Sequence, residues 1–401
     1  MAASDGARAL LDARGRLAGL AGRAATRGAP MIAAAALILV VLAFAWNLGV
    51  HYTGAVMGMP FAARSIAERP ALILIGVCTI LGATLASGGV ETTVGQRIIS
   101  DQYVRVPDAI VIVLAAGSLT MLYNYWKIPT STIQILVFCV VGTGLAGGIP
   151  IHWDTIGKLA IVWVVAPIAA FALGFVFTRL LDLVIPPDAA RAEARSQLEL
   201  EEGSSPSTSQ LARWFPGVAM ARQLPQEVRS AAARSAAAPT ALTLAALRWL
   251  PGLLVVVGVF ASFVLGANDV ANATGALILT RLFPLTIAGL LGGVAMAIGT
   301  LTWGRRILRT VAFDVVKMDL TMASAAQGVQ ALVVLAAVTQ GLFTSMNQAL
   351  IGAMAGTGLA RGRETVQRKQ ILAILRGWVI GPLSGLALAF ALEWALRLIF
   401  R

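Results

Sequence analysis

The residues best suited to hold an anion lie in two similar stretches, 127–148 and 341–362, which match at 10 of their 22 positions. Each stretch contains a Thr-Ser pair followed by a glutamine, and then Gly-Thr-Gly-Leu-Ala. A helix start offers unpaired N–H groups and about half a positive charge, and hydroxyl side chains add further hydrogen-bond donors. Such a site can hold a tetrahedral oxyanion without a fixed cation, which would bind it too tightly for release. The candidate anion ligands in these stretches are Ser131, Thr132, Thr344, Ser345 and Asn347.

A polar segment, 266–275, interrupts an apolar run and contains Asp269 between Asn268 and Asn272. A carboxylate at membrane depth costs about 2.5–3.5 kcal/mol on insertion scales, so it must be paired or protonated. Carboxylate, amide and backbone oxygens suit a hard cation, and Na⁺ is one candidate. A proton is the other. These three residues are therefore candidates for binding a coupling cation, with Asp269 as a direct Na⁺ ligand in the first case.

The first half of the chain has a related but altered segment. When the halves are aligned, Asn47 and Leu48 fall opposite the Asn-Asp pair, so Asn47 is a further candidate anion ligand and the first half lacks the carboxylate. His51 falls opposite Asn272 and is expected to be an interfacial side chain. Glu91 has two readings of equal weight, as an exposed loop residue or as part of the anion path.

The elements around these residues are predicted to be membrane helices. The chain has 401 residues, of which 58% are hydrophobic and 12% charged, which is the composition of an integral membrane protein. Its basic residues lie mostly between apolar segments, so the net charge of +12 indicates membrane topology and not nucleic-acid binding. Ten segments are long enough, or nearly so, to span the hydrocarbon: 31–50, 70–88, 107–125, 129–147, 157–185, 249–266, 285–303, 321–342, 344–360 and 370–398.

These segments predict four regions: a basic tail at 1–30, a transmembrane repeat at 31–185, a polar linker at 186–248 and a second repeat at 249–401. Five spans precede the linker, so the second half should enter the membrane from the opposite side. The fold class is therefore all-α, with about 10–12 membrane segments in two inverted repeats. Lysine and arginine are more frequent on the linker side, which predicts a cytoplasmic linker and a multi-pass protein of the cell membrane.

The 266–275 segment resembles the signature of the inorganic phosphate transporter (PiT) family, which carries it once in each half. The family's second motif, a Pro-Val-Ser-Thr-Thr-His run, corresponds to 129–134 and 343–348. The resemblance covers about 31–185 and 245–400. It implies a transporter with broken or re-entrant helices, an inorganic anion as substrate and a coupling cation in place of any cofactor.

Two departures from the family pattern bear on the substrate. Leu48 replaces the first-half aspartate, and Gln134 and Gln348 stand at the histidine positions. The first half therefore looks closer to the bacterial sulfate permease branch, whereas the second half, with Asp269, looks closer to the phosphate carriers. Sulfate has no proton to donate at neutral pH, so a site made of donors alone favours it. Phosphate and sulfate both stay open, as do Na⁺ and H⁺.

Energetics predict coupled uptake. Bringing a divalent anion into a cell at −100 mV costs about 4.6 kcal/mol, because each charge costs about 2.3 kcal/mol. At least two cations must then accompany it for neutral transport. The sequence thus predicts a secondary active importer that works by alternating access, with phosphate as first substrate and sulfate as alternative. A passive anion channel or a membrane sensor is the alternative of another class. Enzyme motifs are missing from the sequence, and a homodimer is one assembly it allows.

Overall fold

The computed structural model describes residues 2–126, 130–187, 213–216, 241–314, 318–362 and 368–399, and their regular structure is helical apart from one isolated bridge between Ile99 and Ile151. The first half contains α1 (Ala2–Ala62), α2 (Glu68–Leu85), α3 (Gly88–Thr92), η1 (Thr93–Arg97), η2 (Asp101–Tyr103), α4 (Val106–Tyr125), α5 (Thr132–Gly147) and α6 (Trp153–Val184). The second half contains α11 (Ala241–Asp269), α12 (Ala271–Leu279), α13 (Leu285–Gly299), η3 (Thr300–Gly304), α14 (Arg305–Asp314), α15 (Leu320–Val338), α16 (Met346–Ala360) and α17 (Arg368–Ile399).

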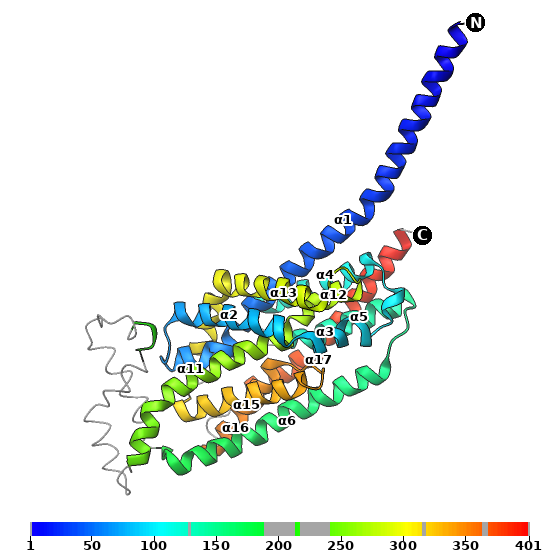
Figure 1. Ribbon diagram of the computed structural model, residues 1–401. Helices are drawn as coiled ribbons and strands as arrows, with labels where there is room; N and C mark the ends of the chain where they lie inside the picture. The colour runs from blue at the N-terminus through cyan, green and yellow to red at the C-terminus, as the bar shows by residue number, and fades with distance from the viewer. Residues whose placement is uncertain are drawn as a thin grey trace.

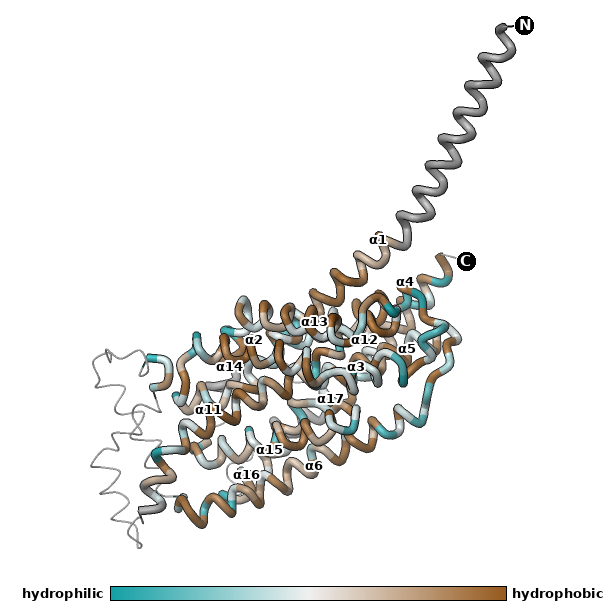
Figure 2. Tube along the Cα trace, viewed as in Figure 1, coloured by the Kyte–Doolittle hydropathy of each residue, from teal (hydrophilic) through white to brown (hydrophobic). Residues whose placement is uncertain are grey.

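Eight helices of the described chain are long and apolar enough to cross a membrane. The shorter helices α5 and α16, of 16 and 15 residues, account for the other two predicted apolar segments. Large hydrophobic side chains lie exposed on the outer helices, for example Val164 on α6 and Val379 on α17, as a lipid-facing surface requires. Figure 2 shows this hydrophobic colouring along the bundle. The predicted all-α membrane fold is confirmed.

Helices of each half pack against helices of the other half. α5 of the first half packs against α17 of the second, while α16 packs against α6 (Figure 1). Glycines permit both contacts: a Cβ on Gly142 would lie 2.4 Å from the carbonyl oxygen of Leu386, and one on Gly356 would lie 1.9 Å from that of Phe171. Each half also has a π-helical turn, η1 or η3, after its second long helix. This common plan is what two related repeats would give, and the inverted relation stays a prediction.

The linker joins two helix ends that lie together. The Thr243 hydroxyl donates to the Val184 carbonyl at 2.9 Å, which ties the start of α11 to the end of α6. α11 begins at Ala241, eight residues before the predicted start of the second repeat. Residues 241–250 are mostly apolar and belong to the same helix. The predicted basic tail, 1–30, is also helical, since α1 begins at Ala2. In Figure 1 the first part of this helix projects from the bundle. Apart from 213–216 and 241–248, residues 188–248 lie outside the described residues.

Candidate anion and cation site

The starts of α5 and α16 meet inside the bundle. Ser131 caps α5 by accepting a hydrogen bond from the Gln134 N–H, and Ser345 caps α16 by accepting one from the Gln348 N–H, both at 3.3 Å. The two glutamine side chains bond to each other in both directions, at 3.1 and 3.4 Å. The caps leave each serine O–H able to donate. Two helix N-termini, each with a partial positive charge, are therefore brought to one place.

Threonine hydroxyls surround this meeting point. Thr132 Oγ1 lies 2.6 Å from the Tyr52 hydroxyl and accepts from Asn272 Nδ2 at 3.4 Å. The Oγ1 atoms of Thr130 and Thr344 are buried and have no hydrogen-bond partner. Buried hydroxyls are normally paired, so two unpaired donors beside helix starts suit an anionic ligand. Pro129, which precedes them, lies outside the described residues.

Asp269 ends α11 and is completely buried. Its oxygens accept from Asn268 Nδ2 at 2.9 Å and from Asn272 Nδ2 at 3.3 Å. Asn268 also binds the backbone of Thr344 twice, giving to its carbonyl at 2.8 Å and accepting from its N–H at 3.3 Å. The three predicted cation residues are thus joined to the start of α16, which is how a cation could influence the anion ligands.

The donor set around Asp269 fits a hard cation or a proton. Asn272 Oδ1 is buried without a partner, and none of the ion pairs found among the described residues includes Asp269. An aspartate and an amide oxygen could hold Na⁺, and a proton would neutralise the carboxylate equally. The described residues contain no cluster of three or more His, Cys, Asp or Glu side chains that would suit a transition metal.

The first-half counterpart differs from this arrangement. Asn47 donates to the Gly117 carbonyl at 3.3 Å and accepts from Asn124 at 3.0 Å, so the structure joins it to α4 and not to the start of α5. His51 lies between Asn124, a hydrogen-bond partner, and Asn347 Nδ2 at 3.0 Å. The expectation that His51 is an interfacial side chain is therefore wrong. Its alignment with Asn272 was the signal that could have placed it here.

Asn347 also lies at the site, but other residues hold its side chain there than those that hold the serines. Besides its contact with His51, its Nδ2 lies 3.5 Å from the Thr130 carbonyl, and its side chain is partly exposed. The sequence singled out neither Tyr52 nor the Gln134–Gln348 pair as ligands. Nothing in the local sequence marks Tyr52, whereas the glutamines recur in both stretches and could have been included.

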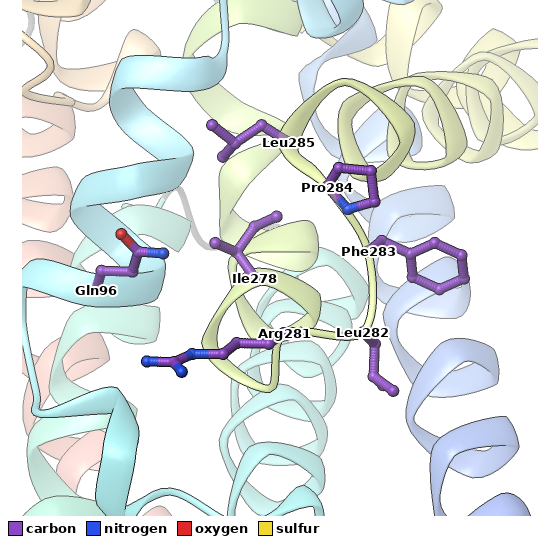
Figure 3. A pocket seen from close by; sticks show the side chains of 7 residues that line it. All are labelled: Gln96, Ile278, Arg281, Leu282, Phe283, Pro284 and Leu285. Atoms are coloured by element: carbon purple, nitrogen blue, oxygen red, sulfur yellow. The ribbon is translucent and has the colours of Figure 1, made fainter.

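A cavity of about 290 Å³ lies away from these residues, beyond the far end of α12 (Figure 3). It is lined by Gln96, Ile278, Arg281, Leu282, Phe283, Pro284 and Leu285. Arg281 is exposed and pairs with Asp101 at 2.9 Å. None of the predicted anion or cation ligands lines this cavity.

Long apolar helices around two buried, polar helix starts define a polytopic membrane transporter, and not an enzyme. The family model described as the phosphate transporter family matches residues 48–389, and the chain belongs to that family. It is a multi-pass protein of the cell membrane, as its family and composition predict.

Two curated relatives carry different substrates in their names. Inorganic phosphate transporter 2-1, chloroplastic, of Arabidopsis thaliana is 26% identical over 87% of this chain and 70% of its own length. Sulfate permease CysP of Bacillus subtilis is also 26% identical, over 89% of this chain and 86% of its own. A solved structure titled "The sodium-dependent phosphate transporter" has the same fold, with a TM-score of 0.73, 23% identity and coverage of 92% of this chain and all of that one.

Proposed function

We propose that the chain is a secondary active transporter that imports an inorganic tetrahedral oxyanion, with phosphate as its first substrate. One observation carries this proposal: the capped starts of α5 and α16 converge beside a buried carboxylate. The helix ends supply N–H groups and partial positive charge, and the Ser131, Thr132, Thr344, Ser345 and Asn347 side chains supply further donors. Because every donor is neutral, the anion can be released after crossing.

Asp269 would bind the coupling cation. The cation would neutralise a carboxylate whose partners in the structure are all neutral, the amides of Asn268 and Asn272 and the hydroxyl of Tyr52, and its charge would offset part of the anion's charge during translocation. The bonds from Asn268 to the Thr344 backbone give a physical link between the two ligands. Na⁺ and H⁺ are both compatible with this donor set. Alternating access would then expose the loaded site to each side in turn.

Sulfate is a second candidate substrate. Leu48 is fully buried where the family pattern has an aspartate, so the first half has no carboxylate there that could accept a proton from hydrogen phosphate. The hydroxyls of Thr130 and Thr344 can donate to either anion. The relative named as a sulfate permease supports the same alternative.

Uptake by proteoliposomes tests these proposals. Labelled phosphate and labelled sulfate would be offered separately, each under an inward Na⁺ gradient and under an inward proton gradient, to the wild type and to Asp269→Asn. We expect gradient-driven uptake of one anion in the wild type and its loss in the variant. Flux that needs no gradient and survives in Asp269→Asn would instead establish a passive channel. A chain that moves neither anion would contradict the proposed function, and a sensor role would then be tested by anion binding alone.

A further inference from the structure

Glu91 is a buried carboxyl group that the transport site described above does not use. Its side chain, on α3, is completely buried. Oε1 accepts a hydrogen bond of 2.6 Å from the Thr274 hydroxyl, and Oε2 has no hydrogen-bond partner. Of the two readings that the sequence allowed, an exposed loop residue is therefore excluded.

The described elements packed against α3 bring no charge into contact with Glu91. Their titratable side chains, and those of α2 before it, are Arg97 on η1, Arg248 and Asp269 on α11, and Glu68, Arg69 and Cys78 on α2. Arg97 is exposed, and α12 and α13 carry no titratable residue. None of the ion pairs found in the described part of the chain includes Glu91. An unpaired carboxylate in an apolar interior is disfavoured, so this group needs a positive partner.

Close packing around Glu91 favours a proton over a metal ion as that partner. A Cβ on Gly289 would lie 2.3 Å from the Ala83 carbonyl oxygen, and one on Gly292 would lie 2.4 Å from the Thr274 methyl carbon. The α13 helix therefore lies close to the α2 backbone and to the Thr274 side chain of α12 on this side. A hard metal cation needs several oxygen ligands around it, whereas a proton needs one free oxygen, and Oε2 is free.

The segment that carries Glu91 touches both parts of the proposed transport site. Its partner Thr274 belongs to the same motif as Asp269 and Asn272. Two residues beyond Glu91, the Thr93 hydroxyl donates to the Gly341 carbonyl at 2.6 Å, in the turn that leads into α16. A change of charge at Glu91 would thus act on α12 and on the start of α16 together.

We propose that Glu91 is a proton-binding site of the transport cycle, separate from the cation site at Asp269. On the loading side, a proton from water forms the O–H bond at Oε2, and after translocation the same bond breaks and returns the proton to water. With one cation at Asp269, this proton gives the two positive charges that balance a divalent anion. The inference rests on the proposed function.

Proton counting in proteoliposomes tests the proposal. The full chain would be reconstituted with a pH-sensitive dye inside, and protons entering per labelled anion would be measured for phosphate and for sulfate. We expect Glu91→Gln to lower this ratio by about one and to weaken the acceleration by an inward proton gradient, while exchange of anion without a gradient persists. An unchanged ratio in Glu91→Gln would overturn the proposal. A wild type that imports either anion without protons would also overturn it and would leave the proposed function standing. A wild type that moves neither anion contradicts both.

Two further variants guard against a structural explanation. Asp154→Asn removes an exposed carboxyl group at the start of α6 and should leave the proton ratio unchanged. Thr274→Val keeps Glu91 but removes the hydrogen bond that favours its charged form, so the midpoint of the pH dependence of uptake should move to higher pH. This second test applies even where Glu91→Gln fails to fold, and an unmoved midpoint would contradict the proposal.

Discussion

At the scale of single residues, the clearest mark of a ligand site is the pair of unpartnered hydroxyls on Thr130 and Thr344. Leaving a buried donor unsatisfied costs about 1–3 kcal/mol. The described residues also leave the hydroxyls of Ser65, Thr120, Thr143 and Ser324 without a partner, so it is the position of Thr130 and Thr344 that marks them. Both threonines lie directly before the serines that cap α5 and α16. Their recurrence at corresponding positions of the two halves makes an anion ligand a better explanation than helix packing.

Replacing either threonine by valine should weaken anion binding. A hydrogen bond to a charged group contributes about 1.5–3 kcal/mol, so Thr130→Val or Thr344→Val should raise the KM for uptake about tenfold or more. Valine has nearly the same shape, which limits other effects. Thr178→Val is the matched control, because its hydroxyl donates within α6 to the Gly174 carbonyl. A KM unchanged in both site variants would remove these hydroxyls from the anion site.

At the scale of elements, packing between helices of the two halves holds the starts of α5 and α16 together. α5 is fixed by α17, and α16 by α6, so each capped helix depends on a helix of the other half. The contacts are close enough that added atoms would clash with backbone. Stability and the geometry of the site are therefore controlled by the same glycines.

Gly356→Ala should destabilise the protein. The added methyl group would lie 1.9 Å from the Phe171 carbonyl oxygen, and overpacking of this kind costs about 1–3 kcal/mol. Thermal unfolding of the purified protein in detergent would show a lower midpoint. Gly157→Ala, on the exposed side of α6 with no atom within 4 Å of the new Cβ, should leave the midpoint unchanged or slightly higher. Equal midpoints for the two variants would show that the α6–α16 contact can relax.

The sequence was sufficient to predict the helices and much of the candidate site. Apolar runs located the ten segments, and the recurring Thr-Ser pairs located the starts of α5 and α16. It was not sufficient for contacts between distant residues, such as Asn347 with His51 or Tyr52 with Thr132. Those contacts depend on how the helices cross in three dimensions, which no local pattern encodes.

At the scale of the whole molecule, charged side chains gather at the two ends of the bundle. At one end, Glu68 forms ion pairs with Arg305 and Arg309, each at 2.5 Å, and Asp182 forms one with Arg361 at 2.7 Å. The linker begins and finishes at this end, beside the bond from Thr243 to Val184. The prediction that the linker is cytoplasmic rests on the higher frequency of lysine and arginine on the linker side of the sequence, since positive loops stay in the cytoplasm.

Accessibility labelling tests that orientation. Ser205, which lies in the linker outside the described residues, and Asp154, at the opposite end of α6, would each be changed to cysteine after replacing Cys78 and Cys139 by alanine. A membrane-impermeant maleimide added to intact cells should label Asp154→Cys and should reach Ser205→Cys only after the membrane is opened. Because α6 spans the bilayer between the two positions, they must respond oppositely. Labelling of Ser205→Cys in intact cells would reverse the orientation, and the basic end of the bundle would then face outward against the charge rule.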